Sequence, residues 1–390
     1  FKAVNDSLGH GEGDRLLVGV SERMVECIRA ADTGARLGGD EFAVLIEDAP
    51  DIGTIVAIAE RIVAALQLPF VLQGKPVAVG ASIGIAQATS DGGAGELLRN
   101  ADVAMYTAKS RGKGRYEIFQ PEMHTAVLAR LELEADLRHA VERGEFVLHF
   151  QPIVELDTGR LSGLEALCRW LHPEKGLVSP ATFIPLAEEM GLIVPLGRWA
   201  LLAACTEARE WQTRHPGAHG VSVSVNISGR QLDNASLVED VATALRDSGL
   251  GAESLVLEIT ESVIMHNTDD TLHRLKDLKS LGVRLAIDDF GTGFSSLSYL
   301  QRFPVDILKI DKSFIDGFGA GGKDSALVRT IIALSDTMKL RTVAEGVETA
   351  AQADELRSLG CALAQGYHFA RPMAPADVDD YLTREEALVG

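Results

Sequence analysis

The spacing of apolar and polar residues changes character along the chain. Up to residue 119, stretches with helical spacing alternate with short apolar runs that have the two-residue alternation of strands. Helices are predicted over residues 14–29, 52–66 and 94–109, and strands over residues 33–46, 70–88 and 116–119. Helices that alternate with strand pairs in this way favour an α+β domain, in which the helices pack on an antiparallel sheet.

An amphipathic segment follows this first domain. It carries Leu128, Leu131 and Leu137 among charged side chains, which is typical of a helix with one apolar face. We therefore predict a first domain over residues 1–119, a connecting helix over residues 120–143 and a second domain after it.

In the second domain, single strands alternate with single helices. The strands are predicted at residues 146–152, 161–170, 221–226, 255–260, 283–288, 306–310, 341–344 and 361–366. Eight strands joined by helical crossovers within about 250 residues are the pattern of a TIM-like (β/α)8 barrel. We therefore expect an α/β protein in which the α+β domain precedes a barrel.

The composition limits the ligands that the chain can hold. Its 390 residues carry a formal net charge of -19 and lack a dense run of Lys and Arg. This balance excludes a protein that grips long nucleic acid through its phosphates. A small phosphorylated ligand is compatible with it, because a bound metal ion supplies the missing positive charge.

The cysteines and the apolar runs indicate the compartment. Cys27, Cys168, Cys205 and Cys361 are scattered without a metal-binding spacing, so we expect a reducing cytoplasm. No apolar run approaches the roughly 18 residues of a membrane helix, and we expect no membrane contact in this chain. Because the chain begins at Phe1 without an initiator Met, we expect a fragment whose parent protein has further sequence upstream, where a membrane anchor would lie.

Polar side chains stand where the strands of the predicted barrel end. They are Asn226, Glu258, Asp288 with Asp289, Lys309, Glu345 and Gln365. Barrel enzymes keep their reactive groups at these carboxyl ends of the strands. In the second strand, the two-residue alternation also places Glu165, Leu167 and Arg169 on one face.

Taken one at a time, each of these residues is better explained by an ordinary polar turn or ion pair. Together, however, five carboxylates that converge in a half-buried mouth must take up protons or bind cations. Ligands that are all oxygen atoms suit hard ions, so Mg2+ or Mn2+ is expected rather than zinc. Two ions that share one Asp would account for the adjacent Asp288 and Asp289.

The motifs that carry these residues resemble those of the EAL family. They are Gln151-Pro152, Glu165-Ala166-Leu167, Asn226, Glu258-Ile259-Thr260-Glu261, the loop from Asp288 to Leu297, Lys309-Ile310-Asp311, Glu345-Gly346-Val347-Glu348 and Gln365-Gly366-Tyr367. The resemblance covers residues 130–385 and implies hydrolysis of cyclic di-GMP to the linear dinucleotide pGpG.

The resemblance also implies a role for each site residue. One metal ion would be bound by Glu165, Asn226, Glu258 and Asp288, and a second by Asp288 and Asp289 with Glu345 and Gln365 completing the surroundings. The attacking water would be polarised by Lys309 or by Glu345, and the substrate would be contacted by Gln151, Leu167, Arg169 and Gln365. Glu261 would brace the loop from Asp288 to Leu297, which in the family links the metal site to a homodimer interface.

Residues 1–119 resemble the GGDEF family of diguanylate cyclases. The resemblance implies that phosphate and metal are held by Gly38, Gly39, Asp40 and Glu41, guanine by Asn5 and Asp14, and the phosphates of GTP by Lys109 and Lys113. Arg29 and Asp32 have the spacing of the family's product-inhibition site, and a capped helix end with a surface ion pair is the alternative. The family's first strand, with one metal-binding Asp, is absent, so we do not expect this chain to make cyclic di-GMP efficiently.

The function expected of the chain is metal-dependent cyclic di-GMP hydrolysis, with the first domain as a regulator that binds guanine nucleotide. Two alternatives stay open. In one, the barrel is a non-catalytic cyclic di-GMP receptor; in the other, the intact parent protein is bifunctional with net synthesis. The complete set of expected ligands favours the enzyme, because loss of a ligand or of Lys309 would have indicated a receptor.

Overall fold

The structure of the chain is a computed structural model, and it describes residues 1–88, 93–215, 217, 220–266, 268–292, 300–317 and 323–389. Two compact units, Phe1–Glu134 and Ala135–Gly390, are described in turn. The border between them falls inside the helix Glu122–Ala140, which lies in the segment predicted to connect the two domains.

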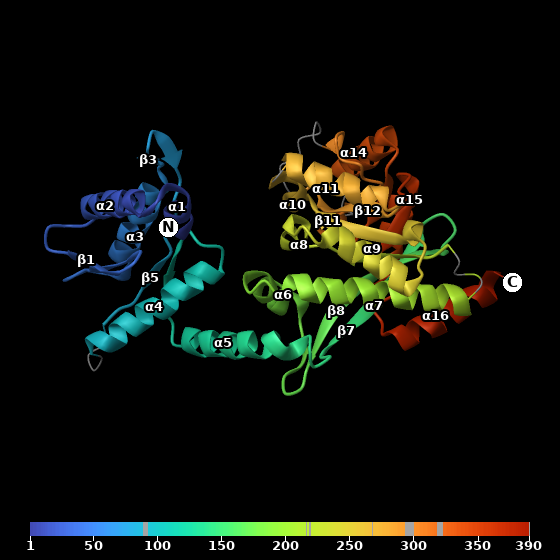
Figure 1. The fold of residues 1–390 in the computed structure, drawn as a ribbon, viewed down its shortest axis with the longest axis horizontal. Helices are drawn as coiled ribbons and strands as arrows, with labels where there is room; N and C mark the ends of the chain where they lie inside the picture. The colour runs from blue at the N-terminus through green and yellow to red at the C-terminus, as the bar shows by residue number, and fades with distance from the viewer. Residues whose placement is uncertain are drawn as a thin grey trace. The chain divides into compact units, whose positions relative to one another are not determined.

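The first unit combines helices with short strands (Figure 1). Its elements are α1 (Lys2–Leu8), α2 (His10–Cys27), β1 (Thr33–Gly38), β2 (Glu41–Leu45), α3 (Ile52–Gln67), β3 (Phe70–Leu72), β4 (Lys75–Val77), β5 (Ile83–Ile85), α4 (Ala94–Ser110), β6 (Tyr116–Ile118) and the first part of α5 (Glu122–Ala140). Ile58, Ile62 and Leu66 recur every four residues on α3 and bury one face of that helix in the core of the unit.

The described strands of the first unit form separate pairs rather than the single antiparallel sheet that was predicted. β1 pairs with β2 and β3 pairs with β4 in antiparallel fashion, whereas β5 and β6 are parallel. The parallel pair follows from the helix α4 between its strands, because parallel neighbours need a crossover connection. Gly84 lets α4 pack directly on β5, since a Cβ atom there would lie 1.9 Å from the carbonyl oxygen of Ala101.

The second unit contains the remaining elements. They are β7 (Phe146–Glu155), β8 (Leu161–His172), β9 (Gly176–Val178), α6 (Pro180–Glu189), α7 (Ile193–Arg214), β10 (Ser222–Asn226), α8 (Gly229–Asp233), α9 (Leu237–Ser248), the 3-10 turn η2 (Ala252–Ser254), β11 (Leu255–Thr260), α10 (Glu261–His266), α11 (Thr268–Ser280), β12 (Arg284–Phe290), β13 (Ile307–Ile310), α13 (Lys312–Ile315), α14 (Lys323–Met338), β14 (Arg341–Ala344), α15 (Ala350–Ser358), β15 (Leu363–Gln365) and α16 (Pro375–Val389).

The strands of the second unit close into a barrel, which confirms the predicted fold class. Hydrogen bonds join β10, β11, β12, β13, β14, β15, β7 and β8 in that order, and β8 pairs back with β10. The neighbours from β8 through β10 to β15 are parallel, as a (β/α)8 barrel requires.

The strand β7 departs from that pattern, because it runs antiparallel to both β15 and β8. A short turn joins β7 to β8, closed by a 2.9 Å hydrogen bond from the backbone N–H of Glu155 to the carbonyl oxygen of Arg160. A turn of this length permits only antiparallel neighbours. Helices were predicted in most of the gaps between strands, and the gap between β7 and β8 is one that holds a turn instead.

Helices cover the outer face of the barrel (Figure 1). Outward-facing strand residues such as Val225, Leu257 and Leu308 share one buried core with helix residues such as Leu201 and Leu275. Apolar burial of this kind is the main force that holds helices on a barrel. None of the helices in the parts of the chain that the structure describes is long and apolar enough to cross a membrane.

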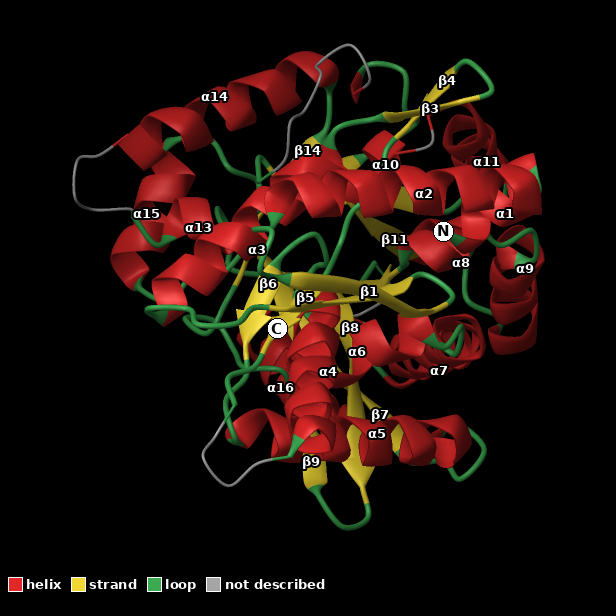
Figure 2. Cartoon of the chain, turned by 90° about the vertical axis from the view of Figure 1, so that its left-hand side faces the viewer, coloured by secondary structure: helices red, strands yellow, loops and turns green. Residues whose placement is uncertain are grey.

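The end of β8 ties the connecting helix to the barrel. β8 runs in one ribbon with β7 and ends in the hairpin with β9 (Figure 2). On it, the indole Nε1 of Trp170 donates to Glu145 at 2.9 Å, and Nε2 of His172 lies 3.0 Å from Oδ2 of Asp136 on α5. Since Nδ1 of His172 accepts the backbone N–H of Glu174, Nε2 carries the proton and donates to Asp136.

Candidate active site and metal centre

Two layers of side chains fill the barrel. The lower layer is an apolar cluster of one residue from each of six strands, namely Ile153, Val256, Ala286, Ile307, Val343 and Leu363. Two residues farther toward the mouth on the parallel strands, the same strand faces carry Glu258, Asp288, Lys309, Glu345 and Gln365. β7 runs the other way, so its polar residue, Gln151, comes two residues before Ile153. The alternation of strands therefore stacks a polar layer on an apolar floor.

Lys309 lies at the centre of the polar layer. Its Nζ atom is 2.5 Å from Glu258, 2.7 Å from Glu345, 3.2 Å from Asp288 and 3.6 Å from Glu165. The side chain of Lys309 is only 1% exposed. One buried ammonium group therefore faces four carboxylates, and the arrangement carries excess negative charge that a cation can neutralise.

Amide side chains orient Glu165 from the other side. Asn226 donates to one of its oxygen atoms at 2.8 Å, and Gln365 donates to the other at 2.6 Å. The same amide of Gln365 lies 3.0 Å from the side-chain oxygen of Gln151, whose own amide donates to the carbonyl oxygen of Ala370 at 3.0 Å. The carbonyl oxygen of Gln365 is buried and has no hydrogen-bond partner among the described residues, so its hydrogen-bonding capacity is unused there.

A local irregularity brings Asp288 and Asp289 to the same cluster. The pairing of β12 with β13 shifts between Ile287 and Phe290, and Asp289 has a positive φ of 54°. This backbone breaks the alternation that would send adjacent side chains to opposite faces. Ligand oxygen atoms of Asp288, Asp289 and Glu345 lie within 4.8 Å of one another, which suits a shared hard cation.

The charge state of the cluster follows from burial and from Lys309. Burial raises the pKa of Glu345 to about 8, although Lys309 opposes the shift. Burial likewise raises the pKa of Glu258 well above its usual value, and Lys309 opposes this shift too. Burial also acts on Glu165, but Lys309 and the amides of Gln365 and Asn226 outweigh it and lower the pKa of Glu165.

The pKa values of Lys309 and Asp289 are raised, as is that of Glu345. Burial opposes the charge of Lys309, but the carboxylates around it raise the pKa of its ammonium group well above the usual value. Burial raises the pKa of Asp289, and the neighbouring charge of Asp288 raises it further. The cluster therefore holds one ammonium group beside carboxyl groups that differ in pKa, which is raised for Glu258, Asp289 and Glu345 and lowered for Glu165.

Glu261, which was predicted to brace the loop, contacts the first residues of that loop. Glu261 is buried, and its Oε2 atom accepts the backbone N–H of Gly291 at 2.8 Å. Gly291 has a φ of +100°, and a Cβ atom there would lie 2.8 Å from the ring of Phe314. The remainder of the loop, with Phe294 and Ser296, lies outside the described residues, so its predicted coupling to a dimer interface stays a prediction.

The substrate contacts predicted on β8 lie on one face of the strand. Glu165, Leu167 and Arg169 face Gln151, His149 and Val147 across the antiparallel pair with β7. The guanidinium group of Arg169 donates to the neighbouring carbonyl oxygen of Cys168 at 2.9 Å and is half-buried. Opposite residues of an antiparallel pair share a face, so Leu167 and Arg169 line the same side of the barrel as Glu165.

In the first unit, the residues predicted to hold nucleotide lie at exposed turns and helix ends. The turn from Gly38 to Glu41 is exposed, as are Asp14, Lys109 and Lys113. Arg36 donates to the carbonyl oxygen of Gly39 at 3.0 and 2.8 Å and so shapes the turn.

Two other residues predicted to bind ligands in the first unit have buried side-chain atoms. The Oδ1 atom of Asn5 is buried without a hydrogen-bond partner among the described residues, and a Cβ atom on Gly13 would lie 1.9 Å from it. The carboxylate of Asp32 accepts the backbone N–H of Arg29 at 2.8 Å, so it closes the turn after α2. This contact is the one expected of a capped helix end, and the product-inhibition site at Arg29 and Asp32 stays a prediction.

Comparison with known proteins assigns each unit to a protein family. The EAL domain family matches residues 134–372, and the family described as diguanylate cyclase, GGDEF domain, matches residues 1–115. The chain belongs to the EAL family. Its EAL domain follows a GGDEF domain, as the motifs of the sequence predicted.

Several relatives share both domains. The bifunctional diguanylate cyclase/cyclic di-GMP phosphodiesterase MucR of Pseudomonas aeruginosa is 46% identical over 97% of this chain and 55% of its own length. The cyclic di-GMP phosphodiesterase NbdA of the same organism is 41% identical over 98% of this chain and 48% of its own length. The chain thus spans about half the length of the curated relatives it matches.

A solved structure supports the barrel fold directly. The PaMucR phosphodiesterase in complex with c-di-GMP is 45% identical, with a TM-score of 0.61 over 63% of this chain and 99% of that chain. The second structural neighbour, the EAL enzyme Bd1971 in its cAMP and cyclic-di-GMP bound form, is 34% identical with a TM-score of 0.62 over 66% of this chain and 70% of that chain.

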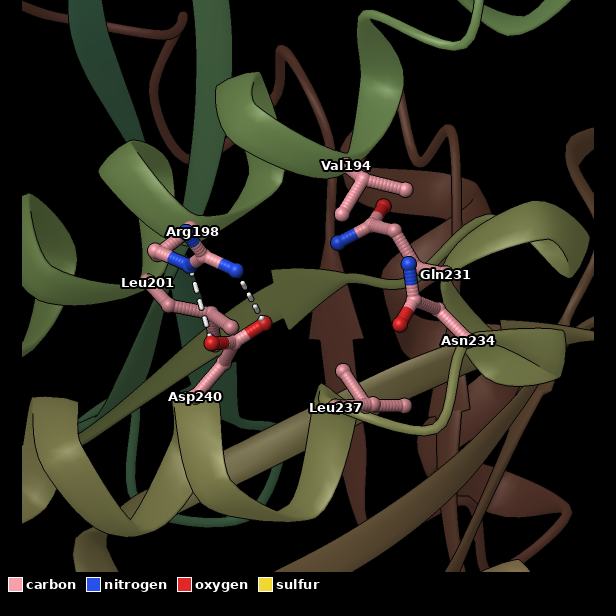
Figure 3. Close-up of a pocket in the computed structure, with 7 residues that line it drawn as sticks. All are labelled: Val194, Arg198, Leu201, Gln231, Asn234, Leu237 and Asp240. Carbon is pink, nitrogen blue, oxygen red and sulfur yellow. Dashed lines mark hydrogen bonds and ion pairs between the residues drawn. The ribbon is translucent and has the colours of Figure 1, made fainter.

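A small hollow on the outside of the EAL barrel does not belong to this site (Figure 3). It is lined by Val194, Arg198, Leu201, Gln231, Asn234, Leu237 and Asp240, which come from α7, from α8 and the turn after it, and from α9. Arg198 donates to both oxygen atoms of Asp240 at 2.8 and 3.3 Å, and Gln231 forms a capping box with Ser228. Asn234 likewise accepts from Ser236 at 2.9 Å, so the polar side chains of the hollow have partners within the fold.

His149 of the EAL barrel was not predicted as a site residue from the sequence. It stands opposite Leu167 and two residues before Gln151, on the same face of β7. Burial lowers the pKa of His149, and the charge of Arg169 lowers it further, so the imidazole is neutral at pH 7. The two-residue alternation that selected Gln151 was the signal that could have found it.

Proposed function

We propose that the EAL barrel hydrolyses cyclic di-GMP to the linear dinucleotide pGpG. The observation that carries the proposal is the buried Lys309 among Glu165, Glu258, Asp288 and Glu345, at the end of the barrel where such enzymes react. The names of MucR and NbdA as cyclic di-GMP phosphodiesterases support the same substrate.

The donor set fits hard divalent ions. Its oxygen atoms come from carboxylates and amides, and the described residues bring no thiolate into it. One Mg2+ or Mn2+ would be held by Glu165, Asn226, Glu258 and Asp288, and a second by Asp288, Asp289 and Glu345. When bound, such ions lower the pKa of a coordinated water and stabilise charge on phosphodiester oxygen atoms.

The residues of the chain then have separate tasks. The Nζ atom of Lys309 donates a hydrogen bond to the attacking water and holds it against the phosphorus. Glu345 would accept a proton from that water once its carboxyl group is ionised, as it must be to bind a metal ion. The water oxygen forms a bond to phosphorus, one ester P–O bond breaks, and the leaving oxygen receives a proton. Gln151 and Arg169 hold the substrate from β7 and β8.

The test compares the unmodified chain with Glu165→Gln in Mg2+ or Mn2+ and with cyclic di-GMP as substrate. We expect pGpG from the unmodified chain, none after chelation, and a loss of turnover of at least about 100-fold in the variant, because an uncharged amide cannot replace a carboxylate ligand. Cyclic di-GMP that binds but stays intact under all metal conditions would instead identify a receptor.

We propose further that the GGDEF domain binds guanine nucleotide at the turn from Gly38 to Glu41 and regulates the barrel, that the EAL domain forms a homodimer, and that both work in the cytoplasm. The exposure of the turn, Asp14, Lys109 and Lys113 supports nucleotide binding. Addition of GTP to the hydrolysis assay tests it: faster hydrolysis identifies a regulatory site, whereas new cyclic product identifies a working cyclase. Sedimentation of the same sample reports the oligomeric state.

A further inference from the structure

We propose that Tyr367 and Arg371 form a platform on which one guanine base of the cyclic dinucleotide stacks. The inference rests on the proposed function, because it assigns the base contact for that substrate. Both residues lie in the segment after β15, and Tyr367 is two residues beyond Gln365, which orients Glu165. They are positioning residues, since they contact the base and leave the reacting phosphate to the polar layer.

The first observation in favour of a ligand site is the exposure of the Tyr367 side chain. The residue is 53% exposed, and the other large apolar residues that are exposed in the described parts of the chain are Val or Leu. The guanidinium carbon of Arg371 lies over the ring, 4.5 Å from its centroid. Arg371 therefore lies over one face of the ring of a residue that is more than half exposed, an arrangement that suits stacking of a base.

The backbone under Tyr367 is held in place. Gly366 is buried, and a Cβ atom there would lie 2.1 Å from the carbonyl oxygen of Val347. Val347 accepts the backbone N–H of His368 at 2.9 Å and donates its own to Gln365 at 3.0 Å, while Gly366 accepts from Phe369 at 3.1 Å. The ring is therefore mounted on a fixed turn, and stacking on it costs little conformational entropy.

The same turn is joined to the polar layer. The carbonyl oxygen of Ala370, the residue before Arg371, accepts the amide of Gln151 at 3.0 Å, and Gln151 lies 3.0 Å from the amide of Gln365. Gln365 in turn donates to Glu165 at 2.6 Å. Three hydrogen bonds therefore set the position of the platform relative to a carboxylate of the proposed metal site.

The charges beside the platform suit a nucleotide. Lys312 donates to Glu348 at 2.6 Å. This hydrogen bond, then the charge of Lys312 and to a smaller extent that of Arg371, lowers the pKa of Glu348. Arg371 thus lies near the Lys312–Glu348 ion pair as well as over the ring of Tyr367. An arginine edge matches the O6 and N7 acceptors of guanine, and an aromatic face accepts any base, so the pair would favour purine cyclic dinucleotides.

The experiment separates base recognition from the chemical step. The full chain and its Tyr367→Ala, Tyr367→Trp and Arg371→Ala variants are assayed with Mn2+ on cyclic di-GMP and on bis(4-nitrophenyl) phosphate, a phosphodiester without a guanine. We expect Tyr367→Ala to raise KM for cyclic di-GMP about 10-fold or more with kcat unchanged, and to leave hydrolysis of the guanine-free ester unchanged. Tyr367→Trp should keep the KM of the unmodified chain, and Arg371→Ala should raise KM as Tyr367→Ala does.

Leu202→Ala is the matched control, because Leu202 is also exposed but lies on α7 outside the barrel. Equal losses on both substrates in Tyr367→Ala, or an unchanged KM, would overturn the platform. Failure of the proposed hydrolysis is recognised separately, by calorimetric binding of cyclic di-GMP: a chain that binds without cleaving still supports the platform if Tyr367→Ala weakens Kd about 10-fold. A Kd that Tyr367→Ala leaves unchanged, or no binding by the unmodified chain, rejects it.

Discussion

The Nζ atom of Lys309 lies 2.5 Å from Oε2 of Glu258, and both side chains are at most 2% exposed. This is the shortest of four contacts between Lys309 and carboxylates in the polar layer. Because each charge is removed from water, each depends on the other, and loss of one leaves the other uncompensated. The pair therefore joins the stability of the barrel to the chemistry proposed for its mouth.

Lys309→Met should destabilise the second unit as well as stop turnover. Removal of one partner of a buried ion pair costs about 3–5 kcal/mol, and here four carboxylates lose their cation together. Urea unfolding in the presence of a chelator should show this loss of unfolding free energy. Added Mn2+ should restore part of it, because a divalent ion can neutralise the same carboxylates. An unfolding curve like that of the unmodified chain would contradict the central role of Lys309.

Metal binding should release protons at pH 7. The pKa of Glu345 is raised to about 8 by burial against the attraction of Lys309, so its carboxyl group is protonated at pH 7, whereas a metal ligand must be ionised. The apparent affinity for Mn2+ should therefore rise between about pH 6 and 8 and level off above that range. Calorimetry in two buffers with different ionisation enthalpies measures the released proton. Glu345→Gln should reduce that release, because Glu258 and Asp289 also have raised pKa values. Identical heats in both buffers for the unmodified chain would contradict the prediction.

Gly366→Ala should strain the turn between the polar layer and Tyr367. The added methyl group would lie 2.1 Å from the carbonyl oxygen and 2.3 Å from the nitrogen of Val347, both of which are backbone atoms. Overpacking against backbone costs about 1–3 kcal/mol or more, so the thermal midpoint should fall. At Gly220 no atom of the described residues lies within 4 Å of such a methyl group, and Gly220→Ala serves as the control. Equal midpoints for the two variants would show that the turn relaxes freely.

Asp379→Asn should lower stability at neutral pH and lose its effect in acid. The side chain forms an ion pair with Arg214 and lies 3.0 Å from Nε2 of His215, which ties α16 to the end of α7. Partial burial opposes the shift, but hydrogen bonds from Arg214 and His215 lower the pKa of Asp379. A carboxyl group with a lowered folded pKa contributes stability above its unfolded pKa of about 3.9 and loses it as pH falls through the folded value.

Thermal unfolding of Asp379→Asn beside the unmodified chain, from neutral pH to below about pH 3, should therefore show two midpoints that converge in acid. Asp380→Asn is the control, because Asp380 is exposed on the same helix. A difference that persists unchanged at the acid end would mean that packing, rather than the charge of Asp379, holds α16.

The sequence by itself determined the elements and the identity of the polar residues at the strand ends. Strand alternation is a local property, so Ile307 and Lys309, or Val343 and Glu345, could be assigned to one face before any fold was known. The same alternation, applied to Gln151, would have included His149. The adjacent Asp288 and Asp289 likewise indicated a cation site, because like charges so close together need compensation.

Only the tertiary structure decided which of these groups meet. Closure of β8 onto β10 brings Glu165 beside Asn226, and the reversal of β7 places Gln151 against Gln365; both depend on pairing between strands far apart in the chain. The backbone at Asp289, with its positive φ, and the central place of Lys309 among four carboxylates also arise only when the barrel closes. Strand register and side-chain burial depend on contacts between residues that are far apart in the chain, whereas periodicity depends only on neighbouring residues. For that reason the composition of the site was readable from the sequence, and its charge state and geometry were not.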